Sequence, residues 1–273
     1  PCQAGISFAE ILAGLSEFFD PLASWPPDAY LRGMPSTFDF CLPSSGKAVP
    51  SGPDWIHEIK YDGFRVRLER DGDRVRLITR GGYNWTDRFP WIVETARRIR
   101  QTHFVIDGEA VVLGVDGVSD FDALISRRHD DEVQLYAFDL LALEGDDLRK
   151  LPLSMRKTNL ARLLARQPEG IFAAPFEQGE IGPDLFDAAC RMGLEGLVSK
   201  HRGRTYRGGR CGHWVKMLWG GGRRGLWHSR RSVQRHQWSA PCRNLLMRAS
   251  PSPPSSRIAR SSPQSRSLNR NGW

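Results

Sequence analysis

The sequence predicts an α+β fold built on antiparallel sheets. Residues 64–80 (FRVRLERDGDRVRLITR) alternate apolar and polar side chains on both sides of a short Asp-Gly-Asp stretch, a pattern typical of a β-hairpin. Strand-like and helix-like segments follow one another in mixed order, with no internal repeat and no regular βαβ alternation. We therefore expect two antiparallel-rich sheets with flanking helices.

The remaining elements follow from local periodicity. A strand over residues 55–59 (WIHEI) leads directly into Lys60, and apolar runs bounded by polar residues or glycine predict strands within 102–114 and 133–143. Apolar side chains at helical spacing predict helices within 91–101, 153–167 and 184–193. Gly193 suits the end of the last of these helices, because glycine readily adopts the left-handed conformation that closes a helix.

Composition restricts the class of protein. The chain has 273 residues, 40% of them hydrophobic, enough for one large or two small globular domains. No apolar run approaches the roughly 18 residues of a membrane helix, and the first residues lack the pattern of a secretory signal, so we expect a cytoplasmic protein with no membrane association. The cysteines are odd in number and lack metal or redox spacing, so we expect them to be reduced and structural: Cys2, Cys41, Cys190, Cys211 and Cys242.

The positive charge lies at the C-terminal end. Residues 219–273 contain eleven arginines and neither lysine nor acid; of the 39 basic residues, 28 then remain against 31 acidic ones in residues 1–218, a balance of −3. Residues 218–273 are expected to be a disordered basic tail, either a nucleic-acid-binding arm or a segment read out of frame. Residues 1–33, which precede the first methionine, are expected to be a leader or fragment, despite an amphipathic pattern at 6–19.

Lys60 stands in the stretch HEIKYDGFR, at the end of the first predicted strand. A lysine there can be an ordinary surface charge, which most lysines are. It can also be a covalent nucleophile, since partial burial and neighbouring cations such as Arg65 favour the neutral form of an amine.

Six ordered motifs decide between these interpretations. EIKYDGFR, TRGG, IDGEAVV, YAFDLL, EGLVSK and HWVKM occur in the order found in ATP-dependent DNA ligases, and the chain resembles the adenylation domain of the bacterial end-joining type. The resemblance covers about residues 34–217 and implies an ATP-grasp-like nucleotide cleft. It also implies that Lys60 attacks the α-phosphate of ATP, passes AMP to a DNA 5′-phosphate and so allows strand sealing in DNA repair or recombination.

The resemblance assigns roles to further residues. Glu58 would contact the adenine edge, Arg65 and Arg80 the ribose and phosphate side, and Glu109 the ribose hydroxyl or a metal ion. Phe138, expected just after a strand, would stack on the base, as a flat aromatic ring can. Glu195, with Glu109, would hold Mg²⁺ or Mn²⁺. Lys200 and Lys216 would grip the triphosphate.

Other polar residues are expected to have supporting roles. Asp62, Asp107 and Asp139 would orient backbone and basic side chains. The histidines show no ligand spacing and are interpreted as surface or packing residues: His57, His103, His129, His201 and His213.

One departure from the family pattern affects the expected activity. Relatives carry a second lysine where this chain has Leu218, and a following OB-fold that we do not recognise in residues 218–273. We therefore expect a monomer that acts on nicked or broken duplex DNA, with end-binding repair proteins as potential partners, and that seals poorly by itself. Two alternatives stay open: a catalytically idle DNA-binding remnant, and an RNA ligase or capping-type nucleotidyltransferase.

Overall fold

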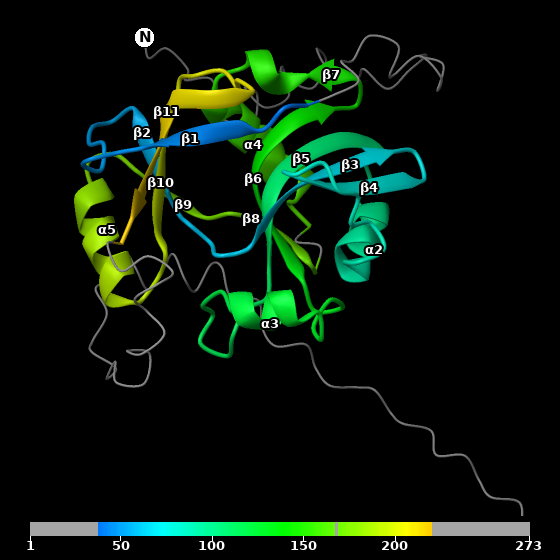
Figure 1. Ribbon diagram of the computed structural model, residues 1–273. Coiled ribbons are helices and arrows are strands. Elements are labelled where there is room, and N and C mark those ends of the chain that lie inside the picture. The colour runs from blue at the N-terminus through cyan, green and yellow to red at the C-terminus, as the bar shows by residue number, and fades with distance from the viewer. Residues whose placement is uncertain (1–37, 167–168, 220–273) are drawn as a thin grey trace, which may run out of the picture.

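The computed structural model describes residues 38–166 and 169–219, and it contains two sheets that lie against each other (Figure 1). The expectations for residues 1–33, and for the tail beyond Trp219, lie outside the described residues. The first sheet has the order β1-β11-β10-β2-β9, with β1 Cys41–Ser45, β11 Gly209–Leu218, β10 Gly196–His201, β2 Trp55–Ile59 and β9 Phe176–Gln178.

The second sheet has the order β4-β3-β5-β6-β7, and β8 pairs with β6. Its strands are β3 Phe64–Asp71, β4 Arg74–Thr79, β5 His103–Val111, β6 Gln134–Leu143, β7 Asp146–Asp147 and β8 Ile171–Ala173. Most pairs are antiparallel, but β1 pairs with β11 and β6 with β8 in parallel. Both sheets are therefore mixed, and the predicted α+β class is confirmed.

The predicted hairpin is β3 and β4. Asp71 pairs with Arg74, so Gly72 and Asp73 form a two-residue turn, and Gly72 has a φ of +60°. Glycine accepts this left-handed conformation without the steric cost that a side chain brings. Val66 and Leu68 are fully buried between partly exposed neighbours, as the alternation predicts.

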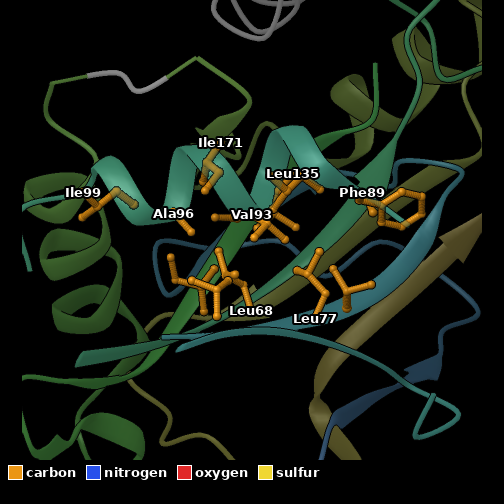
Figure 2. Packing of buried hydrophobic residues seen from close by; sticks show 14 of the residues in the cluster. Leu68, Leu77, Phe89, Val93, Ala96, Ile99, Leu135 and Ile171 are labelled. Atoms are coloured by element: carbon orange, nitrogen blue, oxygen red, sulfur yellow. The ribbon is translucent and has the colours of Figure 1, made fainter. Parts of the chain in front are cut away.

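The main core lies between the second sheet and α2 Pro90–Arg98 (Figure 2). Proline opens this helix, where its missing N–H costs no hydrogen bond. Ile92, Val93 and Ala96 on its buried face pack against Leu68 and Leu77 of the hairpin. Each buried valine, leucine or isoleucine side chain contributes about 1.5–3 kcal/mol, so this cluster stabilises the sheet that carries part of the site.

Two longer helices were also predicted. α4 Leu153–Leu163 packs against β6, and α5 Gly182–Arg191 packs on β2 and β10 of the first sheet, on the side away from the second (Figure 1). After α5, Gly193 has a φ of +72° and the Leu194 N–H bonds the Ala189 carbonyl, the closing arrangement expected from the glycine.

Several short elements lacked a sequence signal strong enough to predict them: α3 Phe121–Ser126, a 3₁₀ turn at Leu148–Lys150, and the strands β1, β7, β8, β9 and β10. In the part of the chain that the structure describes, none of the helices has the length and apolar character needed to cross a bilayer.

Candidate active site

Lys60 and Glu195 meet where β2 ends and β10 begins. The two strands are antiparallel with Ile59 opposite Leu197, and the Lys60 N–H bonds the Gly196 carbonyl at 2.9 Å. Lys60 Nζ donates to Glu195 Oε2 at 2.6 Å, and their side chains are 25% and 23% exposed. The ion-pair partner of Lys60 is thus a carboxylate within reach of solvent, whereas the sequence suggested cationic neighbours.

Arg65, on β3, is held in a fixed orientation by Asp107. Its guanidinium forms two hydrogen bonds with Asp107, at 2.9 and 2.6 Å, and a third with the Cys41 carbonyl at 2.7 Å. It also lies 5.2 Å from the ring centre of Phe138 and 5.5 Å from that of Trp214. Bidentate pairing fixes the orientation of a guanidinium, so Arg65 presents a fixed positive charge. Asp107 orients a basic side chain, as predicted.

Glu109 lies opposite Arg65 in the β3–β5 ladder and is half-buried. Burial raises the pKa of Glu109 to about 7, although Lys60 and Arg65 favour its ionised form; Glu195 and Asp107 oppose ionisation. With a pKa of about 7, the Glu109 carboxyl group binds either a proton or a cation near neutral pH.

A β-bulge in the pairing of β5 with β6 sets the direction of the Phe138 side chain. Asp107 pairs with Asp139 and Gly108 pairs with Ala137, so Phe138 has no partner residue on β5. An unpaired residue of this kind turns the side chain out of the normal alternation. Phe138 was expected just after a strand, and this was wrong: it lies within β6, and the bulge rather than the strand end directs its ring.

Glu58 and Lys200 form a buried ion pair beside the rings of Phe138 and Trp214. Glu58 is 3% exposed and Lys200 2%, with Lys200 Nζ 2.6 Å from Glu58 Oε2. Lys200 Nζ also lies 4.1 Å from the ring centre of Phe138 and 4.2 Å from that of Trp214. Burial lowers the pKa of Lys200 to about 8, against the opposing effect of Glu58. Lys200 therefore lies beside the base-stacking candidate, and its contact with phosphate stays a prediction.

Lys157 of α4 is the third charged residue of this cluster. It lies outside the six sequence motifs, so the sequence did not predict it. Its Nζ lies 2.6 Å from Glu58 Oε1, yet that oxygen accepts no well-aligned hydrogen bond from the described residues. Glu58 Oε1 is thus a buried acceptor with remaining capacity for a donor, such as an amino group of a base.

The two other predicted residues lie at the edge of the site. The Arg80 side chain is exposed, and its backbone N–H bonds the Arg65 carbonyl at 3.1 Å. Lys216 is half-buried on β11 opposite Val198, which in turn lies opposite Glu58 on β2. Lys216 and Glu58 therefore occupy one row across three strands.

Gly63, the glycine of the Lys60 motif, allows two strands to approach each other closely. A Cβ on Gly63 would lie 2.3 Å from the Ala110 carbonyl oxygen. The close approach is between β3 and β5, so this glycine permits the pairing that places Arg65 opposite Glu109.

Glu109 and Glu195 fit a magnesium ion in number and type of donor. Mg²⁺ prefers hard oxygen ligands and commonly takes one or two carboxylates together with substrate phosphates. Among the described residues, the only group of three potential metal-ligating side chains lies elsewhere, at Cys41, Cys211 and His213. Neither the sequence spacing of the cysteines nor that of the histidines indicated this second cluster, because its members come from two strands that are far apart in the chain.

Comparison with known proteins identifies a family and relatives of this chain. Residues 42–217 match the family described as ATP dependent DNA ligase domain. The multifunctional non-homologous end joining protein LigD of Pseudomonas aeruginosa is 34% identical over 171 residues, which are 62% of this chain and 20% of that protein. A DNA ligase of Natronomonas pharaonis is 34% identical over 195 residues, 64% of this chain and 34% of that protein.

Solved structures agree with these sequence matches. The mycobacterial DNA ligase D complexed with ATP and MES superimposes with a TM-score of 0.59 and 32% identity, covering 65% of this chain and 59% of that one. The ligase domain of Mycobacterium tuberculosis LigD has a TM-score of 0.58, also at 32% identity. The chain spans about a fifth of the length of the LigD proteins that it matches.

Proposed function

Since the chain belongs to the ATP-dependent DNA ligase domain family, we propose that it uses Lys60 to take AMP from ATP and passes it to a 5′-phosphate of broken DNA. The observation that carries the proposal is the Lys60–Glu195 pair, partly exposed and flanked by Arg65 and Glu109. A nucleophilic amine, a carboxylate in contact with it and a fixed cation are the groups that phosphoryl transfer needs.

In the first step the Lys60 amine attacks the α-phosphorus of ATP. A nitrogen–phosphorus bond forms, the bond to the bridging oxygen breaks, and pyrophosphate leaves with the electron pair. Glu195 Oε2 is positioned to accept the proton that Nζ loses, because it already accepts a hydrogen bond from that nitrogen. Arg65 provides a positive charge beside the developing negative charge, and Phe138 offers a ring for the base.

Glu109 and Glu195 would hold Mg²⁺ or Mn²⁺, which when bound neutralises charge on the phosphate oxygens. In the later steps the AMP moves to a DNA 5′-phosphate, and the neighbouring 3′-hydroxyl displaces it. Nicked or broken duplex DNA is accordingly the proposed substrate. The end-joining names of the LigD relatives support broken ends and a role for end-binding repair proteins.

A labelling and transfer experiment tests the proposal. The protein is incubated with ATP labelled in the α-phosphate and Mg²⁺, and nicked duplex DNA is added afterwards. We expect an acid-labile, alkali-stable label on the protein that moves to DNA. Labelling by GTP in place of ATP would favour a capping-type enzyme, and DNA binding without any covalent label would favour an idle remnant.

Labelling should depend on the protonation of Glu109. Because its pKa is raised to about 7, Glu109 is largely protonated below pH 7 and cannot then hold a metal ion. We expect the labelling rate to fall about tenfold per pH unit below this midpoint. The measurement is the initial rate of labelling between pH 5.5 and 9 at fixed Mg²⁺.

The variant Glu109→Gln is the matched test of that dependence. It should label more slowly at pH 8, and it should lose the part of the pH profile with a midpoint near 7. A profile for Glu109→Gln that keeps the same midpoint would assign the ionisation to another group. Glu132→Gln, which alters an exposed glutamate outside the site, should match the unmodified protein.

The loop between β10 and β11 provides positive surface for DNA. Residues 202–208 (RGRTYRG) contain three arginines and no acid, and the exposed Arg204 and Arg207 line an open pocket of about 480 Å³ with Trp55 and His201. The six residues of β10 separate this loop from Glu195 by roughly 20 Å, a distance that about six base pairs of duplex span.

Replacing Arg204 and Arg207 together with alanine should weaken binding to nicked duplex DNA about tenfold near physiological salt and lower the slope of log affinity against log salt by about 2. Binding is measured by fluorescence anisotropy at several salt concentrations. Alanine at Arg97 and Arg100, two exposed arginines at the end of α2, is the control. Equal losses in both double variants would mean that the loop contributes only general charge.

A further inference from the structure

Cys41 and Cys211 form a buried pair of thiols at the edge of the first sheet. They lie on the neighbouring strands β1 and β11, 170 residues apart in the chain, and their sulfur atoms are 2.7 Å apart. Cys41 is 0% exposed and Cys211 5%. Neither residue belongs to the adenylation chemistry, although the Cys41 carbonyl accepts a hydrogen bond from Arg65.

The spacing of the two sulfurs favours a direct bond over a shared metal ion. Cys41, Cys211 and His213 bring three ligand atoms within 4.8 Å of one another. Two thiolates on one tetrahedral zinc ion, each at about 2.3 Å, would stand about 3.8 Å apart. The observed 2.7 Å is much shorter than that, so the pair is arranged for contact between its sulfurs and not around an ion.

The surroundings make the two thiols chemically different. The pKa of Cys211 is lowered, chiefly by the hydrogen bond with Cys41 and also by the backbone N–H groups of Trp214 and His213 and the charge of Arg65. The same hydrogen bond and burial raise the pKa of Cys41. Cys211 is also the one with exposed surface, 5% against 0% for Cys41, so an external disulfide meets Cys211 first and Cys41 follows.

We propose that Cys41 and Cys211 are a redox-active pair that closes into a disulfide by exchange with a low-molecular-weight disulfide. The Cys211 thiolate attacks one sulfur of the external disulfide and releases one thiolate from it. Cys41 then loses its proton and attacks the Cys211 sulfur, and a second thiolate leaves. The protein loses two electrons, and the external disulfide is reduced to two thiols.

The edge position of β1 makes this exchange feasible. β1 is the edge strand of its sheet, so Cys211 becomes accessible when only this strand opens. The bond would then tie β1 to β11. It would hold the Cys41 backbone, whose N–H bonds the Tyr206 hydroxyl, while Tyr206 in turn bonds the Asp107 that orients Arg65. Oxidation would accordingly stabilise the chain of hydrogen bonds through Tyr206 and Asp107 that orients Arg65.

The test uses the full chain and oxidised glutathione under non-denaturing conditions. Remaining thiols are then alkylated, and peptides are mapped by mass spectrometry. We expect a peptide pair linked through Cys41 and Cys211 that has lost two hydrogens, with Cys190 alkylated. The melting temperature should rise by about 10 °C, because the bond closes a long loop. Dithiothreitol should reverse both changes.

Variants assign the order of attack. Cys41→Ser should trap a stable glutathione adduct on Cys211, whereas Cys211→Ser should leave Cys41 unmodified, and neither should gain the rise in melting temperature. Cys190→Ser should behave like the unmodified protein.

Two results would overturn the proposal. One is the absence of a linked peptide, with Cys41 and Cys211 alkylated as fast as Cys190 after oxidation. The other is protection of both thiols by one equivalent of Zn²⁺ in protein that oxidised glutathione does not change, which would show a metal site. Because the readouts are mass and melting temperature, they do not depend on ligase activity.

Discussion

Replacing Lys60 with alanine should abolish the covalent labelling of the protein by ATP carrying label in its α-phosphate. The amine is the group proposed to form the bond to phosphorus, so its removal should lower labelling about a thousandfold or more. The measurement is denaturing electrophoresis after incubation with Mg²⁺, with peptide mapping of the unmodified protein to locate the label. The far-ultraviolet circular dichroism spectrum should be unchanged, because the Lys60 side chain lies partly exposed at a strand end.

Lys47→Ala is the control for that experiment. Lys47 is exposed and lies just after β1, so its loss should leave labelling unchanged. Glu195→Ala should give an intermediate result, with slower labelling, since Lys60 remains while its proposed proton acceptor is lost. Label on the Lys60→Ala variant equal to that on the unmodified protein would remove Lys60 from the mechanism and leave the proposed function without its nucleophile.

Replacing Arg156 with alanine should lower the free energy of unfolding by about 3–5 kcal/mol. Arg156 and Asp139 are both 0% exposed and share two hydrogen bonds, at 2.8 and 2.9 Å. Arg156 also donates to the carbonyls of Leu151 and Arg204, and so joins α4 to the loop after β10. Without the arginine, the Asp139 carboxylate would be buried without its hydrogen-bonded ion-pair partner.

Urea denaturation of three variants measures this effect. Arg162→Ala, on the same helix but exposed, should change the free energy of unfolding by less than about 0.5 kcal/mol. Changing both Arg156 and Asp139 to leucine should recover much of the loss, because no unpaired charge then remains. If Arg156→Ala stays within about 1 kcal/mol of the unmodified protein, the buried pair is not a major support of the fold.

Local patterns were sufficient for much of the fold. The alternation over residues 64–80 predicted β3 and β4 because a half-buried strand exposes every second residue. The helical spacing over residues 91–101 predicted α2 for the corresponding reason. α3 was missed because six residues make fewer than two turns, too few for the apolar spacing to repeat.

The order of motifs also located most of the candidate site. Lys60 and Glu195 are 135 residues apart, yet each lies in a motif, so both were predicted as site residues, and the structure places their side-chain atoms 2.6 Å apart. Lys157 lies in no motif, and its contact with Glu58 depends on how α4 packs against β6. The sequence therefore identified the chemistry but not the complete set of charges that tunes it.

The sequence alone determined the α+β class, the positions of the long helices and hairpin, and the lysine proposed as nucleophile. Only the tertiary structure decided which distant side chains touch: the bulge that turns Phe138, the partners of Glu58, and the pairing of Cys41 with Cys211. The physical reason is that sequence patterns describe one segment at a time, whereas contacts join segments that are far apart in the chain. Periodicity reports which face of one segment is buried, whereas strand register and helix packing depend on the free energy of the whole core and set the contacts between segments.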